Sequence, residues 1–155
     1  MPLTCEIEET IAAPPERVFA AITDIDSFGQ WMRGFVRNER LTDGPVGKGT
    51  QFREVRKMFG REAGEVFEIV AWDPPRMFEL YVDGTKGSSK SGWFRFRHTF
   101  TPVAGGTRMT LSGEVGGMSG CMGFLGKFMM SPMKKAIRKD LAAFKAWVER
   151  GAPKG

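Results

Sequence analysis

His98 is the only histidine of the chain and the side chain best suited to proton transfer near neutral pH. It alternates with Phe94, Phe96 and Phe100, so in a strand these four side chains would share one face. On an enclosed apolar face the imidazole could bond to a ligand carbonyl or hydroxyl group, or act as a general acid or base. The alternative is a histidine whose hydrogen bonds are all made within the protein. Because no local motif orients this ring, we predict no catalytic residue.

Two charged residues, Glu54 and Arg56, form a second candidate group. They alternate with Phe52 and Met58, but the opposite phase of the same segment holds Val55, so the pattern does not fix which face is apolar. Inward placement would require a mutual ion pair or a polar ligand group, because burying an unpaired charge is costly. We expect the ordinary outward placement.

No residues suggest a metal or a cofactor. Cys5 and Cys121 lie at opposite ends of the chain, without a CxxC pair or a Cys/His cluster. The glycines between positions 116 and 126 lack the Lys-Ser/Thr ending of a phosphate loop. Tyr81 falls on the polar phase of its segment and is not an assured partner for His98. We therefore predict no metal site and no cofactor.

The element around which these residues must be arranged is a long helix at residues 121–150. Its apolar residues recur every three or four positions, which places them on one face, and they are Met122, Leu125, Met129, Met133, Ile137, Leu141, Phe144 and Val148. The last 35 residues hold eight Lys or Arg and two Asp or Glu, so the net charge of +5 comes from this element. This basic face is either a solvated outer surface or a contact for an anionic membrane or an acidic protein. We expect no binding to nucleic acid, because aromatic residues do not alternate with these basic residues.

The remaining residues predict one α+β domain over residues 1–155. A strand at 3–11 precedes two short helices, the first at 16–23 and the second capped by Asp24. Turn signals about ten residues apart then indicate antiparallel strands, at 35–41, 49–59, 62–72, 76–82, 92–101 and 107–115. No apolar run is long enough to span a bilayer and no signal-peptide pattern is present, so we expect a cytoplasmic protein.

A sheet that is apolar on one face would pack that face against the long helix. We predict an apolar cavity of at least a few hundred Å³ between them. The expected ligand contacts are Phe78, Leu80, Phe94, Phe96, His98, Phe100, Met109, Met122, Leu125, Met129 and Met133. Half of the ten methionines lie at positions 118–133, and this segment is either core or a mobile lid.

The order and spacing of several short phrases resemble the START-like, or Bet v 1-like, superfamily with its polyketide cyclase/dehydrase branch (SRPBCC). The phrases are Ala13-Pro14-Pro15-Glu16-Arg17-Val18-Phe19 followed by Asp24 and Trp31, Val46-Gly47-Lys48-Gly49-Thr50, Trp72-Asp73-Pro74-Pro75-Arg76, Gly105-Gly106-Thr107, and the closing segment 141–149. The resemblance implies a helix-grip fold, a curved antiparallel sheet of about seven strands around the C-terminal helix. It also implies binding or transport of a lipid-, sterol- or polyketide-like molecule. The alternatives are a cyclase- or dehydratase-like enzyme and a chaperone or membrane-associated interaction module.

Overall fold

The computed structural model describes the backbone over residues 2–118 and 121–151, and the side chains over 2–118 and 131–151. Its element order is the one that the sequence predicts, with one additional short 3₁₀ turn, η2. The elements are β1 (Leu3–Ile11), α1 (Pro15–Thr23), η1 (Ile25–Gln30), β2 (Phe35–Arg40), β3 (Gln51–Met58), β4 (Arg61–Asp73), β5 (Met77–Asp83), η2 (Gly84–Lys86), β6 (Trp93–Val103), β7 (Gly106–Gly116) and α2 (Cys121–Glu149).

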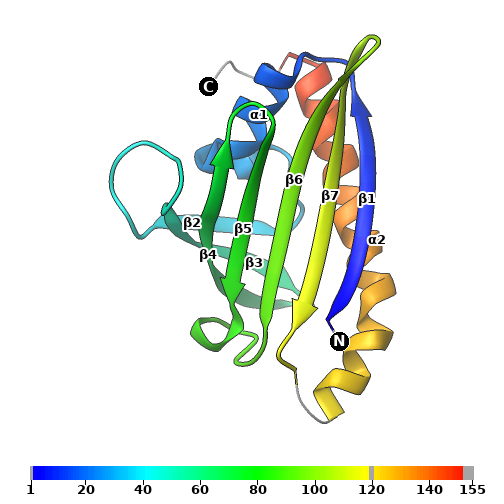
Figure 1. Cartoon of the computed structure of the whole chain (residues 1–155). Helices are drawn as coiled ribbons and strands as arrows, with labels where there is room; N and C mark the ends of the chain where they lie inside the picture. The colour runs from blue at the N-terminus through cyan, green and yellow to red at the C-terminus, as the bar shows by residue number, and fades with distance from the viewer. Residues whose placement is uncertain (1, 119–120, 152–155) are drawn as a thin grey trace.

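The strands form one antiparallel sheet of seven strands in the order β1-β7-β6-β5-β4-β3-β2. Strands β2 to β7 follow one another as a meander, and β1 joins the free edge of β7 with Leu3 opposite Val115. β2 and β3 run across the direction of β5, β6 and β7, so the sheet is strongly curved (Figure 1). The curvature makes a concave face that helices can cover.

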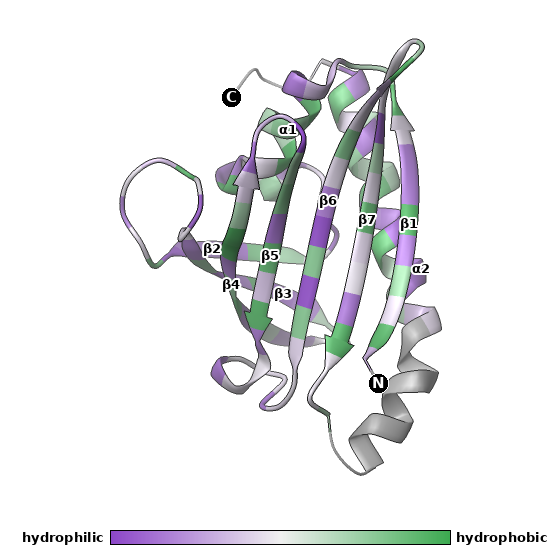
Figure 2. Ribbon diagram, in the orientation of Figure 1, coloured by the Kyte–Doolittle hydropathy of each residue, from purple (hydrophilic) through white to green (hydrophobic). Residues whose placement is uncertain are grey.

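The inner and outer faces of the sheet follow the alternation in the sequence. His98 and Phe100 of β6 are buried, whereas Arg95 and Arg97 lie on the outer face. Both arginines bind the carboxylate of Glu79 on β5, at 2.8 and 2.7 Å. Figure 2 shows the alternation of hydrophobic and hydrophilic residues along these strands. The predicted face assignment for β6 is confirmed.

The residues at the start of the two short helices explain where each helix begins. Pro15 occupies the first turn of α1, where a missing N–H breaks no helical hydrogen bond. The Asp24 side chain accepts a hydrogen bond from the Asp26 N–H at 3.2 Å and caps η1. Phe19 of α1 and Phe28 of η1 are buried. The two elements cover one end of the concave face.

Helix α2 runs along β1 and closes the concave face (Figure 1). Its buried residues include Leu141, Phe144 and Val148, which join one hydrophobic core with Met109 and Leu111 of β7. Beyond the core, the Arg17 guanidinium donates to the Val148 carbonyl at 2.9 Å and fixes the C-terminal part of α2 to α1. These observations confirm the predicted curved sheet around a C-terminal helix. Among the described residues, no helix is long and apolar enough to cross a membrane.

Candidate ligand-binding cavity

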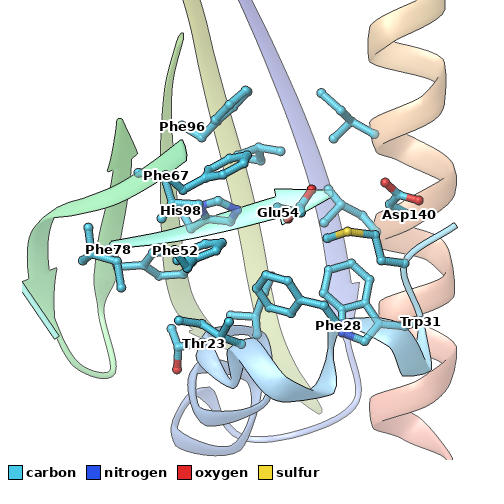
Figure 3. Close-up of a pocket in the computed structure, with 18 of the residues that line it drawn as sticks. Thr23, Phe28, Trp31, Phe52, Glu54, Phe67, Phe78, Phe96, His98 and Asp140 are labelled. Carbon is cyan, nitrogen blue, oxygen red and sulfur yellow. The ribbon is translucent and has the colours of Figure 1, made fainter. Parts of the chain in front are cut away.

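A cavity of about 160 Å³ lies between the concave face of the sheet, η1 and α2 (Figure 3). It is smaller than we expected from the sequence, because six of its lining residues are Phe or Trp and their rings take up much of the space. The described residues that line it are Ile22, Thr23, Ile25, Phe28, Trp31, Met32, Phe52, Glu54, Arg56, Phe67, Ile69, Phe78, Leu80, Phe96, His98, Leu111, Ile137, Asp140 and Leu141. Most of the side chains on this wall are therefore apolar, and only a few are polar.

The aromatic wall is built from neighbouring strands. Phe78 of β5 and His98 of β6 are cross-strand partners, and their rings stack at 4.3 Å with an interplanar angle of 7°. Phe52 of β3 and Phe67 of β4 are also paired and stack at 5.3 Å. Such pairs stabilise a sheet and present flat, rigid surfaces to a ligand.

His98 is buried in this wall and is 7% exposed. Burial lowers the pKa of its imidazole to about 3, and a backbone hydrogen bond at Phe96 offsets this only in part. The ring is therefore neutral at pH 7. Its Nδ1 atom is buried and has no hydrogen-bond partner among the described residues. A buried polar atom without a partner is uncommon and leaves one position free for a ligand group.

A charged cluster lies on the side of the cavity next to α2, and it overturns our expectation for β3. Glu54 and Arg56 point inward, not outward, and meet Asp140 of α2. The Arg56 Nη2 atom donates to the Asp140 Oδ2 atom at 2.5 Å, and the backbone N–H of Arg33 donates to the other Asp140 oxygen at 3.3 Å. Arg56 compensates the charge of Asp140, as a buried charge requires.

Within this cluster, the Glu54 carboxyl group is the least well paired. The Arg56 Nε atom lies 3.4 Å from its Oε1 atom, but the orientation is not that of a hydrogen bond, and Nε has no partner among the described residues. Burial raises the pKa of Glu54 to about 7; Arg56 opposes this increase, whereas the charge of Asp140 adds to it. Glu54 is thus poised to gain or lose a proton near neutral pH.

The predicted ligand contacts fall into three groups. Phe78, Leu80, Phe96 and His98 lie on the cavity wall. Phe100 and Met109 are packed in the core and do not reach the cavity, because α1 covers that end of the sheet, and Phe94 and Met133 are also not on its wall. The side chains of Met122, Leu125 and Met129 lie outside the described residues, as does most of the methionine-rich segment.

Some wall residues were not among the predicted contacts. Phe28 and Trp31, at η1, form the base of the cavity near α2, and the buried indole Nε1 of Trp31 has no partner among the described residues. The position of Asp140 in the helix was an available signal, since it lies three residues after Ile137 and directly before Leu141, on the apolar stripe. An acid at such a position needs a buried partner, and Arg56 is that partner.

The described residues contain no group of three or more His, Cys, Asp or Glu side chains able to hold a metal ion. The polar side chains on the described wall of the cavity are Thr23, Trp31, Glu54, Arg56, His98 and Asp140. They can donate or accept hydrogen bonds and, in the case of Glu54, exchange a proton.

The sequence matches a protein family described as polyketide cyclase/dehydrase and lipid transport, over residues 3–149. The chain belongs to this family. No curated protein matches it significantly. Membership and fold indicate a hydrophobic ligand-binding domain of the START/Bet v 1-like type. They do not support contact of the basic helix with a membrane or an acidic protein.

Solved structures share the fold of this family member at low sequence identity. The protein TTHA0849 from Thermus thermophilus has a TM-score of 0.75 at 20% identity, with 93% of this chain and 95% of that protein covered. Ara h 8.0201 has a TM-score of 0.73 at 16% identity, with coverages of 96% and 98%. A START superfamily protein from Mycobacterium smegmatis has a TM-score of 0.71 at 14% identity, with coverages of 89% and 93%. At these identities the likeness concerns the fold alone, which is the Bet v 1-like helix-grip fold.

Proposed function

We propose that the protein binds a hydrophobic small molecule in the cavity between the sheet and α2, as a carrier or sensor. The observation that supports this most directly is the aromatic wall with a few unpartnered polar atoms. Phe78, Leu80, Phe96 and His98 supply apolar contact from the sheet, and Phe28 of η1 and Trp31, which directly follows η1, supply it from the helical side. The Nδ1 atom of His98 and the Nε1 atom of Trp31 would orient the ligand by hydrogen bonds.

The cavity of about 160 Å³ admits a molecule or a molecular segment on the scale of one aromatic ring without rearrangement. A longer ligand would need to displace one or more rings of the wall. A lipid-, sterol- or polyketide-like molecule would therefore place one segment in this space and extend beyond it.

Binding of N-phenyl-1-naphthylamine, a neutral apolar probe that fluoresces in apolar surroundings, tests this proposal. We expect saturable binding that is lost in Leu80→Trp, because the larger side chain fills the cavity. The matched control is Leu41→Trp, since Leu41 is half exposed and does not line the cavity. Equal binding by both variants, or no saturable binding by the native protein, would refute the proposal. Native mass spectrometry of the purified protein would additionally reveal a co-purified ligand.

A second candidate function is cyclase- or dehydratase-like catalysis. The observation in its favour is the Glu54 carboxyl, whose pKa of about 7 suits general acid/base catalysis at neutral pH, in the same cavity as His98. Turnover of a bound polyketide-like substrate should then fall by about 10²-fold or more in Glu54→Gln. Detection of a product at the same rate in Glu54→Gln would exclude Glu54 from that chemistry.

A further inference from the structure

A second pocket lies on the surface where the end of β3 meets the middle of α2. Its volume is about 330 Å³, and it is lined by Arg33, Arg56, Met58, Pro132, Lys135, Ala136, Lys139 and Asp140. Four of these eight side chains are basic and one is acidic. Its wall is thus markedly positive, in contrast to the apolar cavity.

The two spaces adjoin, because Arg56 and Asp140 line both of them. These two side chains are joined by the hydrogen bond between Arg56 Nη2 and Asp140 Oδ2, which also connects β3 to α2. The buried Arg56 Nε atom lies 3.4 Å from Glu54 Oε1 but makes no hydrogen bond among the described residues. The ion pair therefore stands between the apolar cavity and the basic pocket.

Within the residues that the structure describes, acidic side chains do not balance the positive charge of the surface pocket. Within the described part of the chain, the side chains of Arg33, Lys135 and Lys139 form no ion pair, and Asp140 is already bound to Arg56. By contrast, Lys145 farther along α2 is paired with Glu9 at 3.5 Å. Three basic groups that converge on one pocket without a counter-charge favour an anion and disfavour a cation.

We propose that the ligand is an amphiphile with an anionic head, whose apolar part occupies the cavity and whose head lies in the basic pocket. The head is a carboxylate or a phosphate, since both accept paired hydrogen bonds from a guanidinium group and charge from lysines. Lys135 and Lys139 attract the head from α2, and Arg56, which lines both spaces, lies between the site of the head and the site of the apolar part. This inference rests on the proposed binding function and specifies the chemical class of its ligand.

Competition against bound N-phenyl-1-naphthylamine tests the inference. The competitors are dodecanoate, dodecyl phosphate, neutral dodecanol and inorganic phosphate, all below the concentrations at which they form micelles. We expect one or both anionic amphiphiles to displace the probe at least about tenfold better than dodecanol. Inorganic phosphate should not displace it, because a free anion leaves the apolar cavity unaffected.

Two double variants identify the site of this preference. Lys135→Gln/Lys139→Gln removes two charges from the pocket, and Lys134→Gln/Arg138→Gln removes two charges from the same helix at positions that line neither space. Lys135, Lys139 and Arg138 are exposed and Lys134 is partly exposed, so both variants should fold. The preference for the anionic amphiphile should fall about tenfold in the first variant and less than about twofold in the second.

Three outcomes would overturn the inference. They are competition by dodecanol as strong as that by the anionic amphiphiles, an anion preference that persists in Lys135→Gln/Lys139→Gln, and an equal loss of the preference in both double variants. In each of these cases the neutral probe still binds, and the proposed function stands. If the neutral probe does not bind to the native protein, the proposed function and this inference both fail.

Discussion

The two ends of the space between the sheet and the helices are built differently, although β4, β6 and β7 contribute residues to both. At the end beneath α1, Phe19 contacts Trp72 and Phe100 edge-to-face, at 5.0 and 5.4 Å, and Met109 is completely buried. At the end beside β3, the cavity remains open and the buried Glu54 and Asp140 lie on its wall. We refer to these as the packed end and the hollow end.

The hydrogen bonds differ in the same way. At the packed end the buried Thr107 hydroxyl donates to the Ala13 carbonyl at 2.7 Å and is satisfied. At the hollow end, His98, Trp31 and Arg56 each have a buried nitrogen without a partner in the described part of the chain. An end that served only for stability would be filled and satisfied. The contrast is the one expected if the hollow end receives a ligand, as proposed above, at a cost in stability.

Truncation of the same residue type at the two ends should have unequal effects. Phe100 is packed and Phe96 lies on the cavity wall, and both belong to the inner face of β6. Phe100→Ala should lower the free energy of unfolding by about 3–5 kcal/mol, because it leaves a new void in a close-packed region. Phe96→Ala should cost less than about 2 kcal/mol, since it enlarges a space that already exists. Urea denaturation measures both, and equal losses would remove the distinction between the ends.

The hollow end should also make stability depend on pH through Glu54. Its pKa is about 7 in the folded protein and about 4.5 as a free group, so the folded state binds more protons between these values. The stability that this carboxyl contributes is complete below about pH 4.5 and is lost as the pH rises through 7, by about 3 kcal/mol at most. The free energy of unfolding of Glu54→Gln, relative to that of the native protein, should therefore increase as the pH rises from 5 to 8.

The control for this measurement is Glu8→Gln, a change at an exposed position of β1. Its stability relative to the native protein should differ little between pH 5 and pH 8. An unchanged difference between Glu54→Gln and the native protein over this range would show that Glu54 is ionised at both pH values. That result would contradict our description of the hollow end, in which Glu54 is a buried and poorly paired carboxyl group.

His98 should produce a pH dependence of the opposite sign. Its pKa is about 3 in the folded protein and about 6.5 as a free group, so the unfolded state binds more protons between these values. Stability is therefore present above pH 6.5 and is lost as the pH falls toward 3, by about 2–3 kcal/mol at pH 4.5. His98→Gln should lack this loss, which unfolding at pH 4.5 and pH 7.5 would reveal. If the native protein and His98→Gln lost the same amount of stability at pH 4.5, groups other than His98 would be responsible for the loss.

The smallest expected effect is that of replacing His98 on the affinity for an apolar ligand. Glutamine retains the capacity to donate and accept a hydrogen bond, so His98→Gln should change the affinity for an apolar ligand by less than about tenfold, or 1.4 kcal/mol. Fluorescence titration at pH 7 measures this change. A much larger loss, with stability at pH 7 unaltered, would indicate that the imidazole itself has a specific role in recognition or chemistry.

The fold was predictable because its elements carry local patterns. The alternation in β6 and the three-to-four-residue spacing in α2 each report which side faces the core. In β3 the alternation did not predict which side chains face the core, and the reason is physical. Glu54 and its neighbour Val55 are both buried, so both faces of the strand are covered at this point and alternation no longer distinguishes them.

The site was less predictable than the fold, because it is made of contacts between distant elements. Phe28 and Trp31 could be placed on the apolar side of a short helix, but not against the cavity, since the sequence does not set the distance between η1 and the sheet. The pairing of Arg56 with Asp140 joins residues 84 positions apart. Phe100 and Met109 were assigned to the cavity because they share a face with His98, and only the position of α1 shows that this end is filled.

The central claim is that an apolar ligand occupies the hollow end and not the packed end. Its most direct test is an NMR titration of isotope-labelled protein with N-phenyl-1-naphthylamine, with intermolecular nuclear Overhauser effects assigned to individual side chains. We predict saturable contacts to Phe96, Leu80 and Trp31 and none to Phe100 or Met109. Contacts at the packed end, contacts confined to the outer face of the sheet, or an absence of saturable contacts would contradict the claim.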